Sequence, residues 1–198
     1  MPIESSAQLA KNVWSILEAS KSSAYIGEPI SQFEHAVQAA DRALNTGSID
    51  EVVLAALLHD IGHLVDPNAE QMDKLGTVNH ERLGAKFLSD QGFSTHVTDL
   101  VAAHVDAKRY LCSHHASYYK RLSPASRSTL EWQGGPMSTA ECESFRAWVH
   151  FEDALRLRSF DEQAKEVGYK SPNLALYQRM LERHLRDNVN AKEITRES

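Results

Sequence analysis

Apolar residues recur along much of this chain at the three- and four-residue spacing that marks one face of an amphipathic helix. This spacing predicts helical segments over residues 6–20, 31–45, 78–90, 95–109, 139–166 and 173–187. We expect a bend near His150 to divide the segment 139–166 into two helices. No alternating apolar and polar stretch is long enough to predict a strand, so we expect an all-α bundle.

Start and stop signals support several of these boundaries. Ser31 and Ser138 are each followed three residues later by a glutamate, and this spacing predicts a capping box at the start of a helix. Ser123 precedes Pro124, which is the order of a cap residue and a first helical residue. The Gly-Gly-Pro run at residues 134–136 predicts a break in the chain between two helices.

The segment over residues 51–65, EVVLAALLHDIGHLV, is apolar nearly all round, which is typical of a helix in the middle of a bundle. We expect one continuous core helix that buries His59 and Asp60. Burying an unpaired carboxylate is costly, so Asp60 needs a cation, an arginine or lysine neighbour, or a metal ion. A structural ion pair beside a hydrogen-bonded core histidine is the simpler alternative to a metal site.

Four more side chains that can bind metal are predicted to face the bundle interior from other helices: His35, His80, His104 and Asp161. With His59 and Asp60 they make six ligands, too many for one tetrahedral site but suited to two metal ions. Asp60 can bridge the ions. The first ion would be completed by His35, His59 and Asp161. The second would be held by His80 and His104, with positions left open. Nitrogen and oxygen ligands suit iron, manganese or similar metals without identifying one.

Length and composition indicate one ordinary globular domain over residues 1–198, with 42% hydrophobic and 24% charged residues. The net charge of −6, from 21 basic and 27 acidic residues, gives no global reason to bind nucleic acid. Cys112 and Cys142 lack a metal-binding spacing, so we expect free thiols. Because we find no export leader and no apolar stretch of roughly 18 residues, we expect a cytoplasmic protein without a membrane span.

Several tracts resemble a known family. The pattern formed by His35, His59-Asp60 and Asp161 resembles the metal site of HD-domain proteins. The resemblance is closest to the small mixed-valent diiron oxygenases of phosphonate catabolism, and it spans residues 12–185. It rests on YIGE at 25–28, QFEH at 32–35, LAALLHDIGH at 54–63, HE at 80–81, GA at 84–85, HVDAKRYL at 104–111 and SRSTLEWQGGPM at 126–137.

The resemblance implies an HD-domain helical bundle with two iron ions in a mixed-valent Fe(II)/Fe(III) state, held by the two ligand sets above with Asp60 shared. In the related enzymes a 1-hydroxyphosphonate chelates the more open iron and dioxygen (O2) is the co-substrate. The carbon–phosphorus bond breaks to give a carboxylate and phosphate, without a reductant. For this chain it implies 1-hydroxy-2-aminoethylphosphonate or its trimethylammonio form as the substrate, and glycine or glycine betaine as the product.

Two cations have spacings that place them beside the ligands. Lys108 follows His104 by four residues and Arg158 precedes Asp161 by three, so each shares a helix face with a ligand and can reach a phosphonate oxygen. The alternative is that both side chains extend to the surface and place their charges in solvent. By resemblance, His63, Ser126 and Gln133 complete the anion-binding set, although Ser126 and Gln133 can equally serve local hydrogen bonds. We expect Asp60, His63 and Lys108 to take part in catalysis.

Tyr25 and Glu28 are predicted to lie in a loop, where gating residues are common. The resemblance implies that Tyr25 ligates the open iron until substrate binds, and that both residues then move. Glu28 would face the cationic nitrogen of the substrate. A primary ammonium can donate hydrogen bonds to Glu28, whereas a trimethylated one relies on charge and aromatic faces. The candidate faces, with packing as their alternative role, are Tyr118, Tyr119 and Trp132.

The five remaining histidines are expected to be exposed or to pack against other residues: His96, His114, His115, His150 and His184. Two other functions remain open at this stage. An HD-domain phosphohydrolase would use metal-bound water on a nucleotide or phosphomonoester and would work without dioxygen. A non-catalytic sensing or interaction domain ranks last, because all six ligand positions hold competent side chains. The sequence leaves the oligomeric state open.

Overall fold

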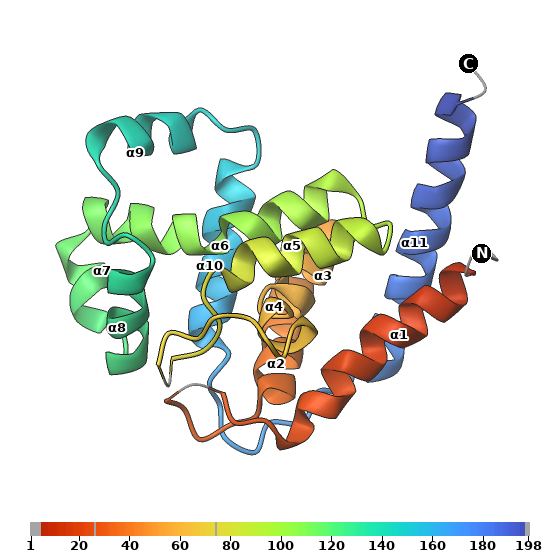
Figure 1. The fold of residues 1–198 in the computed structure, drawn as a ribbon, viewed down its shortest axis with the longest axis horizontal. Helices are drawn as coiled ribbons and strands as arrows, with labels where there is room; N and C mark the ends of the chain where they lie inside the picture. Colours follow the sequence, from red (N-terminus) through yellow and green to blue (C-terminus); the bar gives the residue numbers. More distant parts are fainter. Residues whose placement is uncertain (1–4, 26, 74, 197–198) are drawn as a thin grey trace.

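The computed structural model describes residues 5–25, 27–73 and 75–196, and it is built of helices joined by loops (Figure 1). The helices are α1 (Ser6–Ala19), η1 (Ser20–Ser22), α2 (Gln32–Asn45), α3 (Asp50–Leu58), α4 (Gly62–Val65), α5 (His80–Asp90), α6 (Thr95–His114), α7 (Ala116–Arg121), α8 (Pro124–Trp132), α9 (Thr139–Arg146), α10 (Phe151–Gln163) and α11 (Leu174–Arg196). Over the described ranges the only β-type pairing is two isolated bridges. The expected all-α class is confirmed.

Helix α3 lies in the middle of the molecule and is the most completely buried helix of the core. It packs against α2, α6 and α10, and all its residues from Val52 to Leu58 are at most 1% exposed. Helices α1 and α11 lie side by side along one flank, while α7, α8 and α9 lie at the opposite end (Figure 1). None of the helices in the described ranges is long and apolar enough to cross a bilayer.

The prediction of one continuous helix over residues 51–65 is wrong. Helix α3 ends at Leu58, and a turn over residues 59–61 leads into α4. In this turn the backbone bonds tighten to three-residue spacing, as in the bond from Ile61 N–H to the carbonyl of Leu58. Hydrophobic periodicity does not detect such a break, because both sides of the turn are equally apolar. The turn places His59 and Asp60 at the end of the core helix instead of inside it.

The predicted caps are present. Ser31 and Ser138 each form a complete capping box, and Ser123 caps α8 with Pro124 in its first turn. The expected bend lies between α9 and α10. Helices α6 and α11 both extend beyond their predicted ends. Helix α7 was not predicted, because it has six residues and buries only one of them, Tyr118, so its sequence shows no apolar face.

Gly62 sets the distance between α4 and α5. A β-carbon at position 62 would lie 1.9 Å from the carbonyl oxygen of His80. It would also come close to the backbone of Gly84 on α5. The two helices therefore approach closely enough to hold His80 beside the turn at residues 59–61.

Replacing Gly62 with alanine should force α5 away from α4. We expect Gly62→Ala to lower the free energy of unfolding by about 1–3 kcal/mol or more, because the clash is with backbone and a side-chain rotation cannot relieve it. Urea denaturation monitored by circular dichroism measures the loss. Lys86→Ala, on the exposed face of α5, is the matched control. Equal stability of the two variants would contradict the proposed contact.

Candidate metal centre

The six predicted ligands converge from separate parts of the chain. They come from α2 (His35), the turn after α3 (His59 and Asp60), the first residue of α5 (His80), α6 (His104) and α10 (Asp161). The four imidazoles and Asp161 are buried, and the Asp60 side chain is 14% exposed. Among these six residues, two groups of three side chains are close enough to hold one metal ion each.

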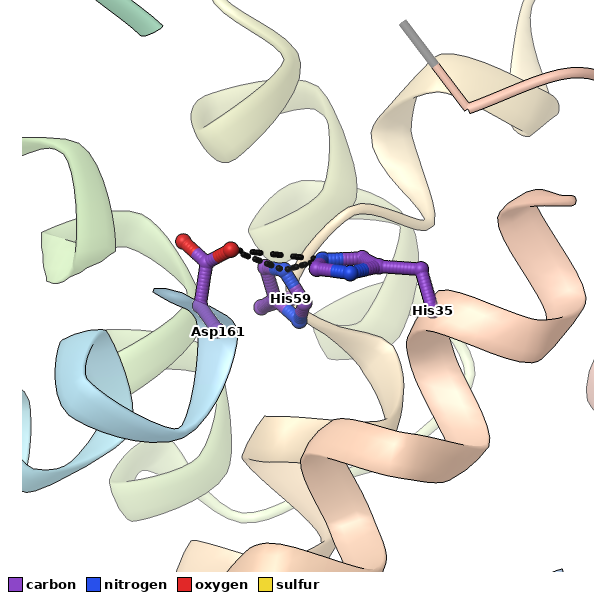
Figure 2. Close-up of side chains that lie close together, drawn as sticks. All are labelled: His35, His59 and Asp161. Atoms are coloured by element: carbon purple, nitrogen blue, oxygen red, sulfur yellow. Dashed lines mark hydrogen bonds and ion pairs between the residues drawn. The ribbon is translucent and has the colours of Figure 1, made fainter. Parts of the chain in front are cut away.

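The first group consists of His35, His59 and Asp161. The Nε2 atoms of the two histidines lie 3.1 Å apart. Oδ1 of Asp161 lies 3.3 Å from Nε2 of His35 and 3.8 Å from Nε2 of His59. Figure 2 shows the three side chains pointing toward one another from α2, the turn after α3 and α10.

The second group consists of Asp60, His80 and His104. The Nε2 atoms of the histidines again lie 3.1 Å apart, and Oδ1 of Asp60 lies 3.4 Å and 3.6 Å from them. The other carboxylate oxygen of Asp60, Oδ2, faces the first group and lies 3.3 Å from Nε2 of His59. Asp60 therefore presents one oxygen to each group, which is the arrangement that a bridging carboxylate needs.

The hydrogen bonds of the imidazoles fit metal binding. Nδ1 of His35, His59 and His104 lies 2.7–2.9 Å from the carbonyl oxygens of Ala164, Ala56 and Val101, respectively. A carbonyl only accepts, so each Nδ1 carries a proton, and whenever such a ring is neutral its lone pair is on Nε2. The Nε2 atoms of His35 and His59 face each other, so a proton or a metal ion must lie between them to prevent repulsion of their lone pairs. A separation of 3.1 Å suits two nitrogens that are each about 2.1 Å from one metal ion.

The ionisable side chains of the centre strongly shift one another's pKa values. Burial opposes the charged form of His59, but the carboxylates of Asp60 and Asp161 outweigh it and raise the pKa of His59 to about 9. Burial also opposes ionisation of the two carboxyl groups, yet His59 beside Asp60, and Arg158 beside Asp161, hold their pKa values well below the usual range. The anionic oxygens thus attract positive charge to the place where the imidazole nitrogens meet.

Comparison with known proteins agrees with this geometry. The family model of the HD domain matches residues 20–139, more than half of the chain. The chain belongs to the HD-domain family. Five of the six ligands lie inside the matched range, and Asp161 lies beyond it, on α10.

Two relatives indicate which branch of the HD-domain family this is. Hydroxymethylphosphonate dioxygenase of Gimesia maris is 43% identical over 155 residues, which cover 77% of this chain and 77% of the relative. The glycine-betaine-forming [1-hydroxy-2-(trimethylamino)ethyl]phosphonate dioxygenase of Leisingera caerulea is 37% identical over 166 residues, which cover 81% of this chain and 84% of the relative. The expected membership in the HD-domain phosphonate oxygenases is confirmed.

A cavity opens onto the second group of this HD-domain centre. Four of the predicted metal ligands line this cavity, namely Asp60, His80, His104 and Asp161, whereas His35 and His59 do not. Six of the predicted substrate residues line the same cavity: Tyr25, His63, Lys108, Ser126, Gln133 and Arg158. A small molecule in this cavity therefore reaches all three side chains of the second group but only Asp161 of the first group.

Two buried cations line this cavity. Lys108 is 4% exposed and Arg158 is 6% exposed, so neither is a surface charge. Nζ of Lys108 donates to Oγ1 of Thr129 at 3.0 Å, and burial together with the charge of Arg158 lowers the pKa of Lys108 to about 7. Sequence reasoning did not single out Thr129, although it lies in the tract that resembles the family.

The guanidinium of Arg158 is held from two directions. Nη1 donates to Oδ2 of Asp161 at 2.5 Å, and Nε donates to the hydroxyl oxygen of Tyr118 and to Oε1 of Glu162 at 2.9 Å and 3.0 Å. The Tyr118 hydroxyl in turn donates to Glu162. Tyr118 is thus a positioning residue for Arg158, whereas the sequence analysis offered it as an aromatic face for a cation. Tyr119 and Trp132 are exposed and, like Tyr118, are absent from the cavity lining.

The other predicted anion-binding residues differ in how they are held. His63 stacks on His80, and its Nδ1 accepts the backbone N–H of Thr77 at 3.0 Å. Burial and the neighbouring His80 lower the pKa of His63 to about 3, so this ring is neutral and can donate from Nε2. Oε1 of Gln133 is buried without a hydrogen-bond partner, whereas the Ser126 hydroxyl lies 3.2 Å from that of Ser123 at the start of α8.

The two predicted gating residues have different surroundings in the structure. The ring of Tyr25 stacks on His35 with 3.8 Å between centroids, and burial, followed by Asp161 and Asp60, raises the pKa of its hydroxyl. Glu28 does not line the cavity. It forms an ion pair with Lys165 at 2.7 Å. Lys165 was not predicted, because a pair 137 residues apart leaves no local signal in the sequence.

The histidines outside the centre mostly pack or form hydrogen bonds. His96 and His150 stack at 4.0 Å, and with Asp153 they form a third, partly buried group whose ligand atoms are close enough to hold a metal ion. His114 stacks on Tyr110, and His184 accepts the backbone N–H of Ser94. His115 is exposed beside α7.

Removing the shared carboxylate tests the two-metal centre. We expect Asp60→Ala to lose both metal ions, because each group takes one oxygen from this residue, while the wild-type protein retains two ions per chain after dialysis. Mass spectrometry of the metal content measures this. The matched control is Asp90→Ala, which removes an exposed carboxylate that belongs to none of these metal-binding groups and should leave two ions bound. An Asp60→Ala protein with its full metal complement would rule out the shared role.

Proposed function

We propose that this protein cleaves the carbon–phosphorus bond of a 1-hydroxy-2-aminoethylphosphonate-type substrate in an iron- and dioxygen-dependent reaction. The amine is primary or trimethylated, and the products are phosphate and glycine or glycine betaine. The observation that carries this proposal is the cavity over Asp60, His80 and His104, whose other walls include the buried cations Lys108 and Arg158. The names of the two relatives, both phosphonate dioxygenases, support it.

We infer that the centre holds two iron ions in the mixed-valent Fe(II)/Fe(III) state, and the dioxygenase names of the two relatives support this choice of metal. Four imidazoles and two carboxylates offer nitrogen and oxygen atoms only, which suits iron that must bind dioxygen and an oxyanion. When bound, the iron pair would supply the reduction of dioxygen and would polarise the hydroxyl and phosphonate oxygens of the substrate. His35, His59, Asp60 and Asp161 would hold one ion, and Asp60, His80 and His104 the other.

The overall reaction balances without a reductant. A 1-hydroxyphosphonate dianion, R–CH(OH)–PO3²⁻, and one dioxygen give R–COO⁻, HPO4²⁻ and a proton. The carbon–hydrogen and carbon–phosphorus bonds break, and both oxygen atoms of dioxygen end in the products. The substrate loses the four electrons that dioxygen gains.

The cavity residues divide into groups that bind the phosphonate. Lys108 and Arg158 would offset its two negative charges, and neutral His63 would donate a hydrogen bond from Nε2. Gln133 lines the same cavity, and its side-chain Nε2 would donate to the remaining phosphonate oxygen. Because these groups are buried, each contact is stronger than it would be in water.

Glu28 would bind the cationic nitrogen of the substrate, with Tyr25 moving in the same loop. In the described structure Lys165 already occupies the Glu28 carboxylate. A substrate ammonium must therefore take the place of Lys165 or share the carboxylate with it. A primary ammonium has N–H groups for that exchange, whereas a trimethylammonium competes through charge alone.

Phosphate release tests this function directly. Iron-loaded protein should release phosphate from 1-hydroxy-2-aminoethylphosphonate or its trimethylammonio form only when dioxygen is present. Hydroxymethylphosphonate is the amine-free comparison substrate. Equal release without dioxygen would instead indicate a hydrolase, and absence of release from all three would overturn the proposed substrate class.

Loss of the Lys108 ammonium should weaken substrate binding without emptying the centre. We expect Lys108→Met to raise KM about 10- to 100-fold, because a buried charged hydrogen bond contributes about 1.5–3 kcal/mol. Iron content should equal that of the wild type. Loss of iron from this variant would mean that Lys108 supports the ligands instead.

The lowered pKa of Lys108 also predicts a pH dependence. Lys108 is charged below its pKa of about 7 and neutral above it, and a phosphonate dianion binds the charged form. The KM of the wild type should therefore rise, relative to that of Lys108→Met, as pH increases from 6 to 9. The substrate's own ionisation affects both proteins equally and cancels in the ratio. A ratio that stays constant over this range would refute the assignment.

A further inference from the structure

One of the four ligand histidines, His80, differs from the others in the group that its Nδ1 atom faces. His35, His59 and His104 each place Nδ1 against a backbone carbonyl. Nδ1 of His80 instead faces Oε2 of Glu81 at 3.6 Å. These two atoms are among five buried side-chain nitrogen and oxygen atoms without a hydrogen-bond partner in the described part of the chain.

The Glu81 carboxylate has little else to bind. The residue is 8% exposed, and its other oxygen lies 3.9 Å from Nε of Arg82, which is beyond hydrogen-bond distance and on a side chain that is 79% exposed. Leaving a buried carboxylate oxygen and a ring nitrogen unpaired costs free energy, so a short approach of the two atoms is favoured. A carboxylate in the first turn of α5 also lies where the helix dipole stabilises negative charge.

The need for this carboxylate follows from the charge of the two groups. The first group has Asp161 as a carboxylate of its own and shares Asp60. The second group has only the shared Asp60. When Nε2 of His80 ligates a metal ion, the ring proton lies on Nδ1. A carboxylate that accepts this proton's hydrogen bond makes the imidazole a stronger metal ligand than a carbonyl acceptor would.

We propose that Glu81 is a positioning residue that strengthens metal binding at the second group, by accepting a hydrogen bond from Nδ1 of His80. This inference rests on the two-metal centre of the proposed function but not on the substrate.

The test is a metal titration of full-length protein with Co(II), followed by visible absorption under anaerobic conditions. We expect Glu81→Gln to weaken binding at the second group about 10- to 100-fold and to leave the first group unchanged. Asp161→Asn should weaken the first group and so identifies which binding step belongs to which group. Glu182→Gln, an exposed glutamate on α11, is the matched control. Unchanged binding, or equal weakening of both groups, would overturn the proposal.

A second measurement needs no variant and holds if Glu81→Gln does not fold. In Zn(II)-loaded wild-type protein, the Nδ1 proton of His80 should resonate downfield of those of His35, His59 and His104 in the proton NMR spectrum, because its acceptor alone is a carboxylate. A His80 resonance within the range of the other three contradicts the role of Glu81. Neither measurement depends on turnover. A failure of the phosphonate assay would therefore overturn the proposed substrate without deciding the role of Glu81.

Discussion

The rest of the structure depends on one electrostatic constraint: two carboxylates and four imidazoles meet in the interior of a small helical protein, largely removed from water. The buried anions of Asp60 and Asp161 need positive charge, and the facing nitrogens of the histidine pairs need a cation between them. A metal ion at each group satisfies both needs at once. The fold can be understood as the set of backbone positions that brings these six side chains together.

The backbone meets this constraint at defined places. The turn at residues 59–61 directs His59 and Asp60 toward different partners, and the close approach at Gly62 keeps His80 beside them. Carbonyl acceptors fix the rings of three histidines. Arg158 joins the centre to the cavity, because the same guanidinium bonds to Asp161 and lines the space above the second group. Ligand binding and anion binding therefore share one network of charges.

Much of this arrangement could be predicted from the sequence. Helical periodicity and capping residues located most helices, and ligand chemistry on separate helices located the six residues of the centre. The turn inside the core segment could not be predicted, because the residues before and after it are equally apolar. The roles of Tyr118 and Lys165 could not be predicted either, since each depends on a partner far along the chain. The unpaired oxygen of Glu81 is visible only once the rings are placed.

The central claim is that two metal ions occupy adjacent groups that share Asp60. Crystals of the iron-loaded protein, measured on both sides of the iron absorption edge, test it most directly. We predict two anomalous difference peaks per chain, one among His35, His59 and Asp161 and one between His80 and His104, with the Asp60 carboxylate between them. A single peak, or a second peak away from His80 and His104, would contradict the shared two-metal centre.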